Sequence, residues 1–366
     1  MAETIQTNSP LDRLLSAAFK LSASDIHLKA GGVPRYRIQG VLRAVEFPEV
    51  SEEQLEDFCR ALTGLSSEDL KNRSQLEFVF QWSDKGRFRG HYYKTLGQTA
   101  LALRAIPFII PAMGDLRLPA VLKKLCGEIQ GLILVTGATG MGKSTTLAAM
   151  LDFIAKNSCR HIISIEDPVE FVVRDGSSCV TQREVGRDIK DFEEGLVAAL
   201  RQDPDVIMIG EIRDRETMEV AMRAAVSGHL VLGSAHFTDS TSTIEGLVSM
   251  APPDERQNWR FRLAESLKAI ISQRLLPKRD ANDRVLAAEI LVNHAVVKDC
   301  IQDPTKTKGI RNAIIRGRPE FGTQTMDQSL LELLEARQIT LDIAKGAASS
   351  PSELAREVNV RRIETD

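Results

Sequence analysis

A glycine-rich segment at residues 137–145 combines the residue types and the spacing that hold phosphate groups. It fits the pattern G-x-x-x-x-G-K-[ST], with Gly137, Gly142, Lys143 and Ser144 in the specified places. The glycines let backbone N–H groups turn onto phosphate oxygens, the lysine adds a full positive charge, and the serine hydroxyl can bind Mg²⁺. The residues predicted to line this site are Gly137, Ala138, Thr139, Gly140, Met141, Gly142, Lys143, Ser144 and Thr145.

The flanks of this segment argue for a phosphate site and against a tight turn without chemical use. Residues 131–136 form an apolar run that predicts a buried strand, and residues 145–155 predict a helix. A strand, a glycine loop and a helix in this order bring the positive end of the helix dipole to the phosphates. The sequence therefore predicts that the chain binds a nucleoside triphosphate.

Acidic residues follow two further apolar runs. Glu166 and Glu170 come after the run at residues 161–165, and Glu211 comes after the run at 205–209. In a parallel sheet with a phosphate loop, chemistry gathers at the carboxyl ends of the strands. Hydrolysis needs one carboxylate that orients and deprotonates water, and another that holds Mg²⁺ directly or through water. We therefore expect these three glutamates in the site; the alternative is that they are solvated loop acids.

Two histidines, His229 and His236, bracket the next apolar run. The strand between them is predicted to lie beside the strand that ends before Glu211. An imidazole at a strand end could detect the γ-phosphate and transmit its loss to the next element. A buried, hydrogen-bonded histidine is the plainer interpretation. Zinc is not favoured, because no third ligand stands at metal spacing.

The bulk properties limit the class of protein. The chain has 366 residues, enough for two domains, and is 43% hydrophobic and 27% charged, as soluble proteins are. A net charge of −3 disfavours a protein that coats nucleic acid. The five cysteines never form a C-x-x-C pair, which predicts a reducing compartment without disulfides. We expect no signal peptide and no membrane-spanning segment, and hence a cytoplasmic protein that reaches a membrane only through partners.

The composition changes near residues 107–118, where prolines and a glycine predict a linker. Before it, residues 1–106 contain alternating segments typical of strands and two amphipathic helices, which predicts a small α+β domain. After it, residues 119–285 alternate apolar runs with helices, which predicts a parallel sheet covered on both faces. Residues 286–366 are predicted to be mostly helical. The clearest helices in the last third of the chain are expected at residues 261–275 and 326–337.

These segments together resemble one family, the secretion ATPases of the type II and type IV pilus superfamily, and most closely the pilus-retraction ATPases of the PilT and PilU type. The resemblance covers nearly the whole chain. The matching segments are residues 24–28 (SDIHL), 87–89 (RFR), 104–107 (RAIP), 137–145 as the Walker A loop, 161–170 (HIISIEDPVE) as the Asp box, 181–186 (TQREVG), 200–211 (LRQDPDVIMIGE) as the Walker B strand, 228–236 (GHLVLGSAH) as the His box and 324–330 (QTMDQSL).

The resemblance implies a homo-hexameric ring of two-domain subunits that hydrolyses ATP with Mg²⁺. The N-terminal domain would be PAS-like, followed by a RecA-like P-loop ATPase core and helical C-terminal additions. ATP would lie between the two domains and be completed by a neighbouring subunit, with Arg89 and Arg104 acting on the phosphates. The resemblance assigns Glu170 as the general base, and Glu211 with Ser144 to Mg²⁺ or its water. The reverse assignment of the two glutamates stays open.

Two features bear on the branch of the family. Assembly and type II secretion members usually carry an extra N-terminal domain and a four-cysteine metal loop, and neither is expected here. This favours retraction of a type IV pilus through an inner-membrane platform protein, by a motor peripheral to that membrane. Against it, retraction ATPases commonly carry Ala-Ile-Arg-Asn-Leu-Ile, whereas residues 295–301 read Ala-Val-Val-Lys-Asp-Cys-Ile. An accessory motor beside a paralogous retraction ATPase therefore stays open.

Three other functions are distinguished by their partners or their turnover. A ring ATPase that powers effector export or DNA transfer would share every site residue and differ in its partner. A RecA-like nucleic-acid motor is disfavoured by the net charge, so no nucleic-acid partner is expected. A nucleotide-binding regulator would bind ATP without hydrolysing it.

Overall fold

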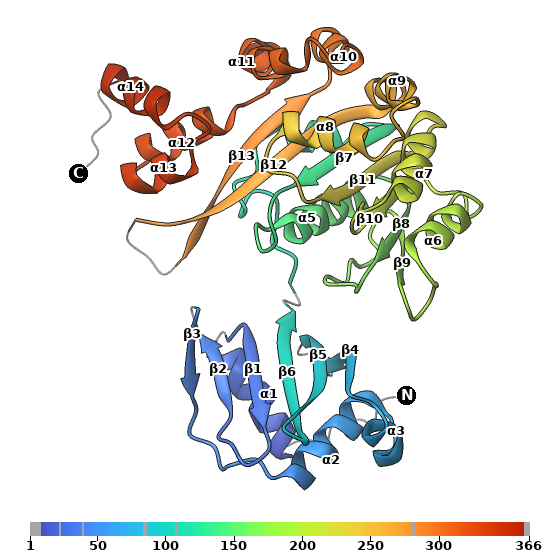
Figure 1. The fold of residues 1–366 in the computed structure, drawn as a ribbon, viewed down its shortest axis with the longest axis vertical. Coiled ribbons are helices and arrows are strands. Elements are labelled where there is room, and N and C mark those ends of the chain that lie inside the picture. Colours follow the sequence, from blue (N-terminus) through green and yellow to red (C-terminus); the bar gives the residue numbers. More distant parts are fainter. Residues whose placement is uncertain are drawn as a thin grey trace. The chain divides into compact units, whose positions relative to one another are not determined.

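The computed structural model describes residues 9–21, 23–38, 40–82, 86–106, 109–279 and 283–361. The chain divides into two compact units, Met1–Ile109 and Ile110–Asp366, which we describe separately (Figure 1). Part of the expected linker, Pro107 and Phe108, lies outside the described residues. No helix among the described residues is long and apolar enough to cross a membrane.

The first unit is built on a six-stranded antiparallel sheet with the strand order β3-β2-β1-β6-β5-β4. The expectation of a mixed α+β domain is confirmed, while its PAS-like character stays a prediction. The elements are α1 (Pro10–Lys20), β1 (Asp25–Lys29), β2 (Arg35–Ile38), β3 (Val41–Ala44), α2 (Glu52–Thr63), α3 (Ser67–Lys71), β4 (Gln75–Trp82), β5 (Gly86–Thr95) and β6 (Gln98–Ile106).

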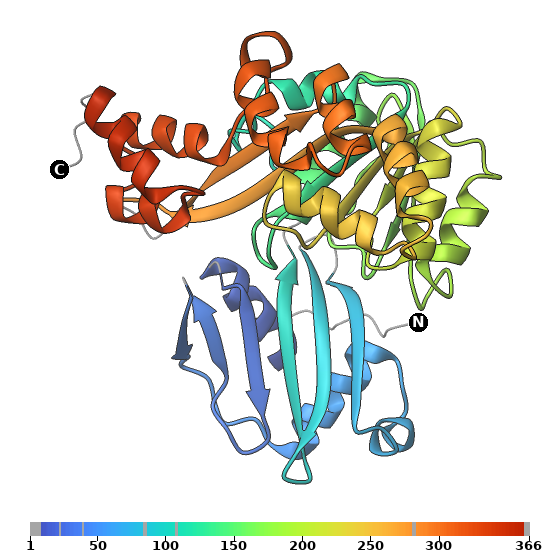
Figure 2. The ribbon, with the colours of Figure 1, turned by 45° about the horizontal axis from the view of Figure 1, so that its top comes forward.

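Helices α1 and α2 cover the sheet through one apolar core (Figure 2). In α1 the buried residues Leu11, Leu14, Leu15 and Ala18 recur at helical spacing and so form a single stripe. They pack with sheet residues such as Phe88, which is fully buried. Burial of one face of the helix is therefore what attaches it to the sheet.

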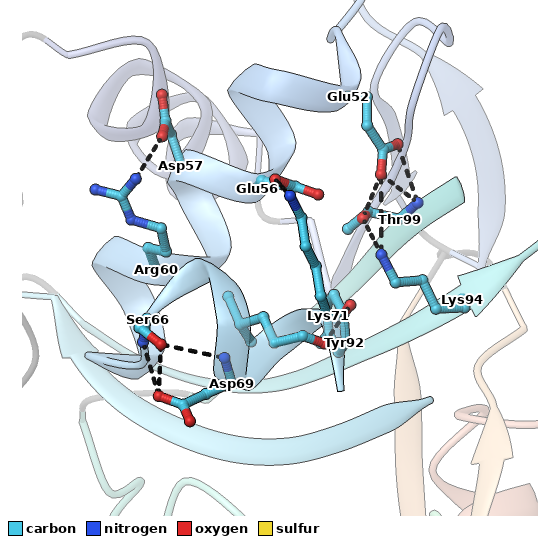
Figure 3. A network of polar contacts seen from close by, with 11 residues as sticks. Glu52, Glu56, Asp57, Arg60, Ser66, Asp69, Lys71, Tyr92, Lys94 and Thr99 are labelled. Carbon is cyan, nitrogen blue, oxygen red and sulfur yellow. Dashed lines mark hydrogen bonds and ion pairs between the residues drawn. The ribbon is translucent and has the colours of Figure 1, made fainter. Parts of the chain in front are cut away.

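Polar contacts join the start of α2 to the beginning of β6 (Figure 3). The Glu52 carboxylate accepts hydrogen bonds from the backbone N–H of Thr99 at 3.0 Å and from its hydroxyl at 2.6 Å. Thr99 is fully buried, so these bonds satisfy groups that water cannot reach. Ser51 and Gln54 cap the same helix end reciprocally.

The second unit is built on a seven-stranded sheet with the order β13-β12-β7-β11-β10-β8-β9. All neighbours from β12 to β9 are parallel, and β13 is antiparallel at the edge. This confirms the predicted α/β fold class with a parallel-sheet core. The strands are β7 (Gly131–Thr136), β8 (His161–Glu166), β9 (Cys179–Glu184), β10 (Val206–Ile209), β11 (Leu230–Ala235), β12 (Leu267–Pro277) and β13 (Arg284–Val292).

Both faces of the central part of this sheet are buried, which explains why a central strand such as β10 is apolar at every position. Leu132 and Leu134 of β7 join a core cluster on one face, and Ile133 and Val135 join a second cluster on the other. The helices of the unit are α4 (Val121–Cys126), α5 (Lys143–Asn157), α6 (Phe192–Ala199), α7 (Arg215–Val226), α8 (Ser240–Ser249), α9 (Arg256–Ser266), α10 (Ala295–Gln302), α11 (Ile310–Phe321), α12 (Met326–Glu335), α13 (Leu341–Ala347) and α14 (Pro351–Arg361), with a 3₁₀ turn at Thr307–Gly309.

The helix expected over residues 261–275 is wrong beyond Ser266. The structure ends α9 there and continues as β12, which pairs with β7 on one side and β13 on the other. Ala269 and Ile271 of β12 face one core cluster and Ile270 faces the other, so the period is that of a strand. A short apolar run cannot be assigned by periodicity alone, and here pairing with β7 decides it.

The C-terminal part is helical after β13, which runs through the boundary expected at residue 286. Helices α12, α13 and α14 form a separate core with the outer ends of β12 and β13, including Leu276 and Val285. The helix expected at residues 326–337 is confirmed as α12. These helices therefore pack on the strand pair that extends beyond the parallel sheet.

Candidate functional site

The glycine loop connects the carboxyl end of β7 to the first turn of α5, as predicted. Gly137, Gly140 and Gly142 have φ values of 146°, 80° and 85°, in the region that residues with a Cβ rarely adopt. Gly142 is the N-cap of α5, and no side chain caps this helix end. The N-terminal N–H groups of α5 are thus presented with the helix dipole, an arrangement that fits an anion such as a phosphate.

Strand β12 supports the loop from behind. A Cβ added to Gly137 would lie 2.7 Å from the backbone oxygen of Gln273, so the loop passes very close to this strand. The Gln273 side chain donates to the hydroxyl of Thr146 in α5 at 2.7 Å. Thr136 bonds Ser272 at 2.8 Å. Sequence reasoning missed Ser272 and Gln273 because it placed them in a helix.

Lys143, the first residue of α5, is buried, and its side chain turns back into the loop. Its ammonium group donates to the carbonyl oxygens of Gly137 at 2.8 Å and Ala138 at 3.2 Å, and it lies 3.3 Å from Nδ1 of His236. Burial lowers the pKa of Lys143, and the carboxylates of Glu211 and Glu170 partly oppose this shift. The lysine charge is therefore held inside the loop and faces two of the predicted acids.

Glu211 and His236 meet at this edge of the sheet because β7, β11 and β10 are parallel neighbours. Nε2 of His236 lies 2.8 Å from a carboxylate oxygen of Glu211. Because Lys143 can donate to Nδ1, the contacts fit an imidazole whose proton is on Nε2 and is donated to Glu211. A continuous chain of polar contacts therefore runs from Lys143 through His236 to Glu211.

Arg213, which sequence reasoning did not single out, completes this cluster. Its guanidinium group contacts both oxygens of Glu211 at 2.7 Å. Burial of the Glu211 carboxyl raises its pKa, but the Arg213 hydrogen bond and nearby positive charges, Lys143 among them, outweigh burial and lower it. Glu211 is thus held as a carboxylate. In the sequence, an arginine two residues after Glu211 is only a weak signal of an ion pair. The geometry of the folded chain is what shows the contact.

Glu166 and Glu170 lie at the end of β8 and in the loop that follows it. Glu166 is buried and accepts hydrogen bonds from the hydroxyl of Ser164 at 2.7 Å, from Gln182 at 2.9 Å and from the backbone N–H of Glu170. Burial raises its pKa, and these hydrogen bonds offset only part of the rise. Glu170 is only partly buried. In this geometry Glu166 is bound to residues of β8, of β9 and of the loop after β8, while the charge of Glu170 acts on that of Lys143.

The structure does not bring His229 to this cluster. It precedes β11, where Nδ1 contacts the carbonyl of Ala224 at 3.0 Å, whereas His236 follows the same strand. At about 3.3 Å per residue the two histidines are roughly 20 Å apart, because His229 lies at the amino end of β11 and His236 at its carboxyl end. The direction of the strand therefore separates two residues that look equivalent in the sequence.

Arg89 and Arg104 belong to the first unit. They lie opposite each other on β5 and β6, where Arg89 pairs with Glu77 at 2.8 Å and Arg104 with Asp25 at 2.9 Å. Both arginines keep exposed side-chain area. Their predicted action on phosphates stays a prediction. Of the remaining loop residues, Ser144 is exposed in the first turn of α5, as a Mg²⁺ ligand would require.

Comparison with known proteins covers nearly the whole chain. Residues 3–352 match the family described as Type II/IV secretion system protein. The chain is 36% identical over 342 residues to the type IV pilus retraction ATPase PilT of Pseudomonas aeruginosa, covering 93% of this chain and 98% of that protein. It is also 36% identical over 344 residues to the type IV pilus ATPase PilU of the same organism, covering 94% and 90%.

A solved structure agrees with this match. The crystal structure of the pilus retraction motor PilT with bound ADP superposes with a TM-score of 0.85 and 40% identity, covering 94% of this chain and 98% of that one.

Proposed function

This chain belongs to the family of type II/IV secretion system proteins, and on that premise we propose that it is an ATP-hydrolysing motor for retraction of a type IV pilus. The observation that carries the proposal is the chain of contacts from Lys143 through His236 to Glu211, at the mouth of the glycine loop. The similarity to PilT, including a PilT structure with ADP, supports ATP as the nucleotide.

The described residues fit ATP with Mg²⁺. When bound, this pair supplies the phosphoanhydride bond and the cation that neutralises the phosphate charge. Residues 137–145 would hold the phosphates through backbone N–H groups, and Lys143 would leave the carbonyls of its own loop to contact them. Ser144 and Glu211 would hold the cation or its water. Glu170 would accept the proton of the attacking water, with the reverse assignment of the two glutamates still open.

We infer a homo-hexamer whose subunits complete one another's sites. In that arrangement Arg89 and Arg104 would exchange their partners Glu77 and Asp25 for phosphate oxygens. The Arg89–Glu77 pair is exposed on both sides, so that exchange would cost little. Asp25 is only 13% exposed, but it would keep Arg37 at 3.8 Å after Arg104 leaves. Force would pass to an inner-membrane platform protein at the cytoplasmic face of that membrane. A paralogous motor could share the work, and the equal identity to PilT and PilU leaves principal and accessory roles open.

Hydrolysis is tested with purified protein by release of phosphate and by binding of a fluorescent ADP analogue. Lys143→Ala should abolish binding, while Lys156→Ala at the exposed far end of the same helix should not. Glu170→Gln and Glu211→Gln should retain binding and slow turnover by about 10²-fold or more. The exposed Glu193→Gln serves as the matched control. Wild-type protein that binds ADP but releases no phosphate would identify a regulator and refute the proposal.

A second function, energising a secretion system, is favoured by one observation. In residues 295–301 the arginine that retraction ATPases commonly carry is lost or replaced by Lys298, which pairs with Glu265 of α9 at 2.6 Å. Deletion of the gene in its host separates the two functions. Pili that accumulate on cells unable to twitch support retraction, whereas unchanged pili with lost secretion support the second function.

A further inference from the structure

Gln182 lies in the middle of β9, the edge strand next to β8. Its register partner across the parallel pair is Ser164, and Glu166 lies two residues further along β8, on the same face. Gln182 is partly buried, in the segment that joins the sheet edge to the loop after β8. None of the roles assigned above to residues of the phosphate loop or of the acidic cluster includes this side chain.

The carboxamide of Gln182 makes three hydrogen bonds. Its Nε2 donates to the carboxylate of Glu166 at 2.9 Å and to the carbonyl oxygen of Phe171 at 2.9 Å. Its Oε1 accepts the backbone N–H of Val173 at 2.8 Å. The amide thus binds the backbone on both sides of residue 172, as a neighbouring strand would, and joins this segment to Glu166.

This set of contacts requires a carboxamide. Both Nε2 protons are donated to acceptors and Oε1 accepts from a donor. The N–H groups and the oxygen of the carboxamide therefore all have partners. A carboxylate of the same shape could still accept from Val173. It could not donate to Phe171, and it would face the carboxylate of Glu166. The two carboxyl groups would then compete for one proton.

The contacts of Gln182 and Glu166 reach both the backbone N–H of Glu170 and the residue that follows it. The Glu170 N–H is bonded to the Glu166 carboxyl, and Phe171 follows Glu170 directly in the chain. A second contact from β9 acts nearby, because the carboxylate of Glu184 accepts the backbone N–H of Val169 at 3.2 Å. The segment from Val169 to Val173 is therefore held by side chains of β9 on either side of Glu170.

We propose that Gln182 is a positioning residue for Glu170: its carboxamide holds Glu166 and the backbone at residues 171–173, and so sets where the Glu170 carboxylate stands relative to the phosphate loop. The inference deepens the proposed ATPase function and rests on it. It explains why a glutamine is needed at position 182 of the TQREVG segment. In this arrangement Glu166 transmits the effect of Gln182 to the backbone of Glu170.

The test compares Gln182→Ala, Gln182→Glu and the matched control Gln202→Glu, an exposed glutamine of the same unit. Both Gln182 variants should lower kcat by about 10- to 100-fold, because a displacement of about 1 Å at a reacting group has this effect. The dissociation constant for a fluorescent ADP analogue should change less than about threefold, because no contact of Lys143 or of the loop is removed. Gln202→Glu should match the wild type in both quantities.

The pH profile separates positioning from a general loss of structure. Gln182→Glu should recover turnover as the pH falls, because protonation of one of the two facing carboxyls restores a donor. Glu170 and Glu184, the register partner of Glu166, also face this pair and are present in all variants. Gln182→Ala has no such carboxyl and should show no recovery relative to the wild type. Wild-type kcat and pH profile in both Gln182 variants would overturn the inference, as would equal losses in kcat and nucleotide affinity.

Amide hydrogen exchange gives a readout that does not depend on turnover. The N–H groups of Glu170 and Val173 should exchange faster in Gln182→Ala. In Gln182→Glu the Val173 N–H should stay protected, while that of Glu170 should not. If the wild type releases no phosphate, the proposed function fails, and exchange still decides the inference. Unchanged exchange at both amides in Gln182→Ala would overturn it.

Discussion

Replacing Gly137 with alanine adds a methyl group at a point where the phosphate loop passes against the backbone of β12. The new Cβ would lie 2.7 Å from the backbone oxygen of Gln273, which cannot rotate away as a side chain can. The φ of 146° is also strained for any residue with a Cβ. Backbone strain costs about 1–3 kcal/mol, and overpacking costs about 1–3 kcal/mol more. We therefore expect Gly137→Ala to destabilise the second unit by about 2–6 kcal/mol.

Gly140→Ala is the matched control in the same loop. Its φ of 80° carries a left-handed penalty, but an added Cβ would meet nothing within 4 Å. We expect a cost of about 1–2 kcal/mol, from backbone conformation alone. The difference between the two variants therefore measures the contact with β12.

The assay can report on the second unit alone. The chain has two tryptophans, Trp82 in the first unit and Trp259 in the second, and Trp259 is buried. In a Trp82→Phe background, urea unfolding followed by fluorescence reports the unfolding of the environment of Trp259. Equal shifts of the urea midpoint for Gly137→Ala and Gly140→Ala would refute the close approach of loop and strand. A much larger shift for Gly137→Ala, with weakened nucleotide binding, is the expected result.

Two further predictions concern the carboxylates of Glu52 and Glu211. Glu52→Ala leaves the buried Thr99 N–H and hydroxyl without their acceptor and should destabilise the first unit by about 1–3 kcal/mol in Trp82 fluorescence unfolding. Glu53→Ala, in the same helical turn but exposed, should cost much less, and equal costs would contradict the argument. The pKa of Glu211 is lowered in the folded chain, so its contribution to stability is present above its ordinary pKa of 4.5 and is lost as the pH falls below it. The wild type should therefore lose more stability than Glu211→Gln between about pH 5 and pH 3, and parallel urea titrations of the two would exclude the paired carboxylate.

Local patterns in the sequence predicted the elements whose character depends on near neighbours. The glycine loop with its strand and helix, the parallel apolar strands and the small α+β unit were all predicted correctly. Each of these signals depends on residues a few positions apart, such as the spacing from Gly137 to Lys143 or full apolarity through β7. Strand β12 was mistaken for part of a helix. Its identity depends on pairing with β7, which lies more than a hundred residues earlier in the chain.

The sequence by itself determined that this chain has a phosphate loop and acids at the ends of parallel strands. Only the tertiary structure decided which polar groups meet there. It joined His236 to Lys143 and Glu211 at the carboxyl end of β11. It left His229 at the amino end, because the six residues of this strand lie between the two histidines. It also brought Arg213 against Glu211, Gln182 against Glu166 and β12 against the phosphate loop. Side-chain contacts between strands depend on sheet order and register, and these are set by the packing of the whole sheet.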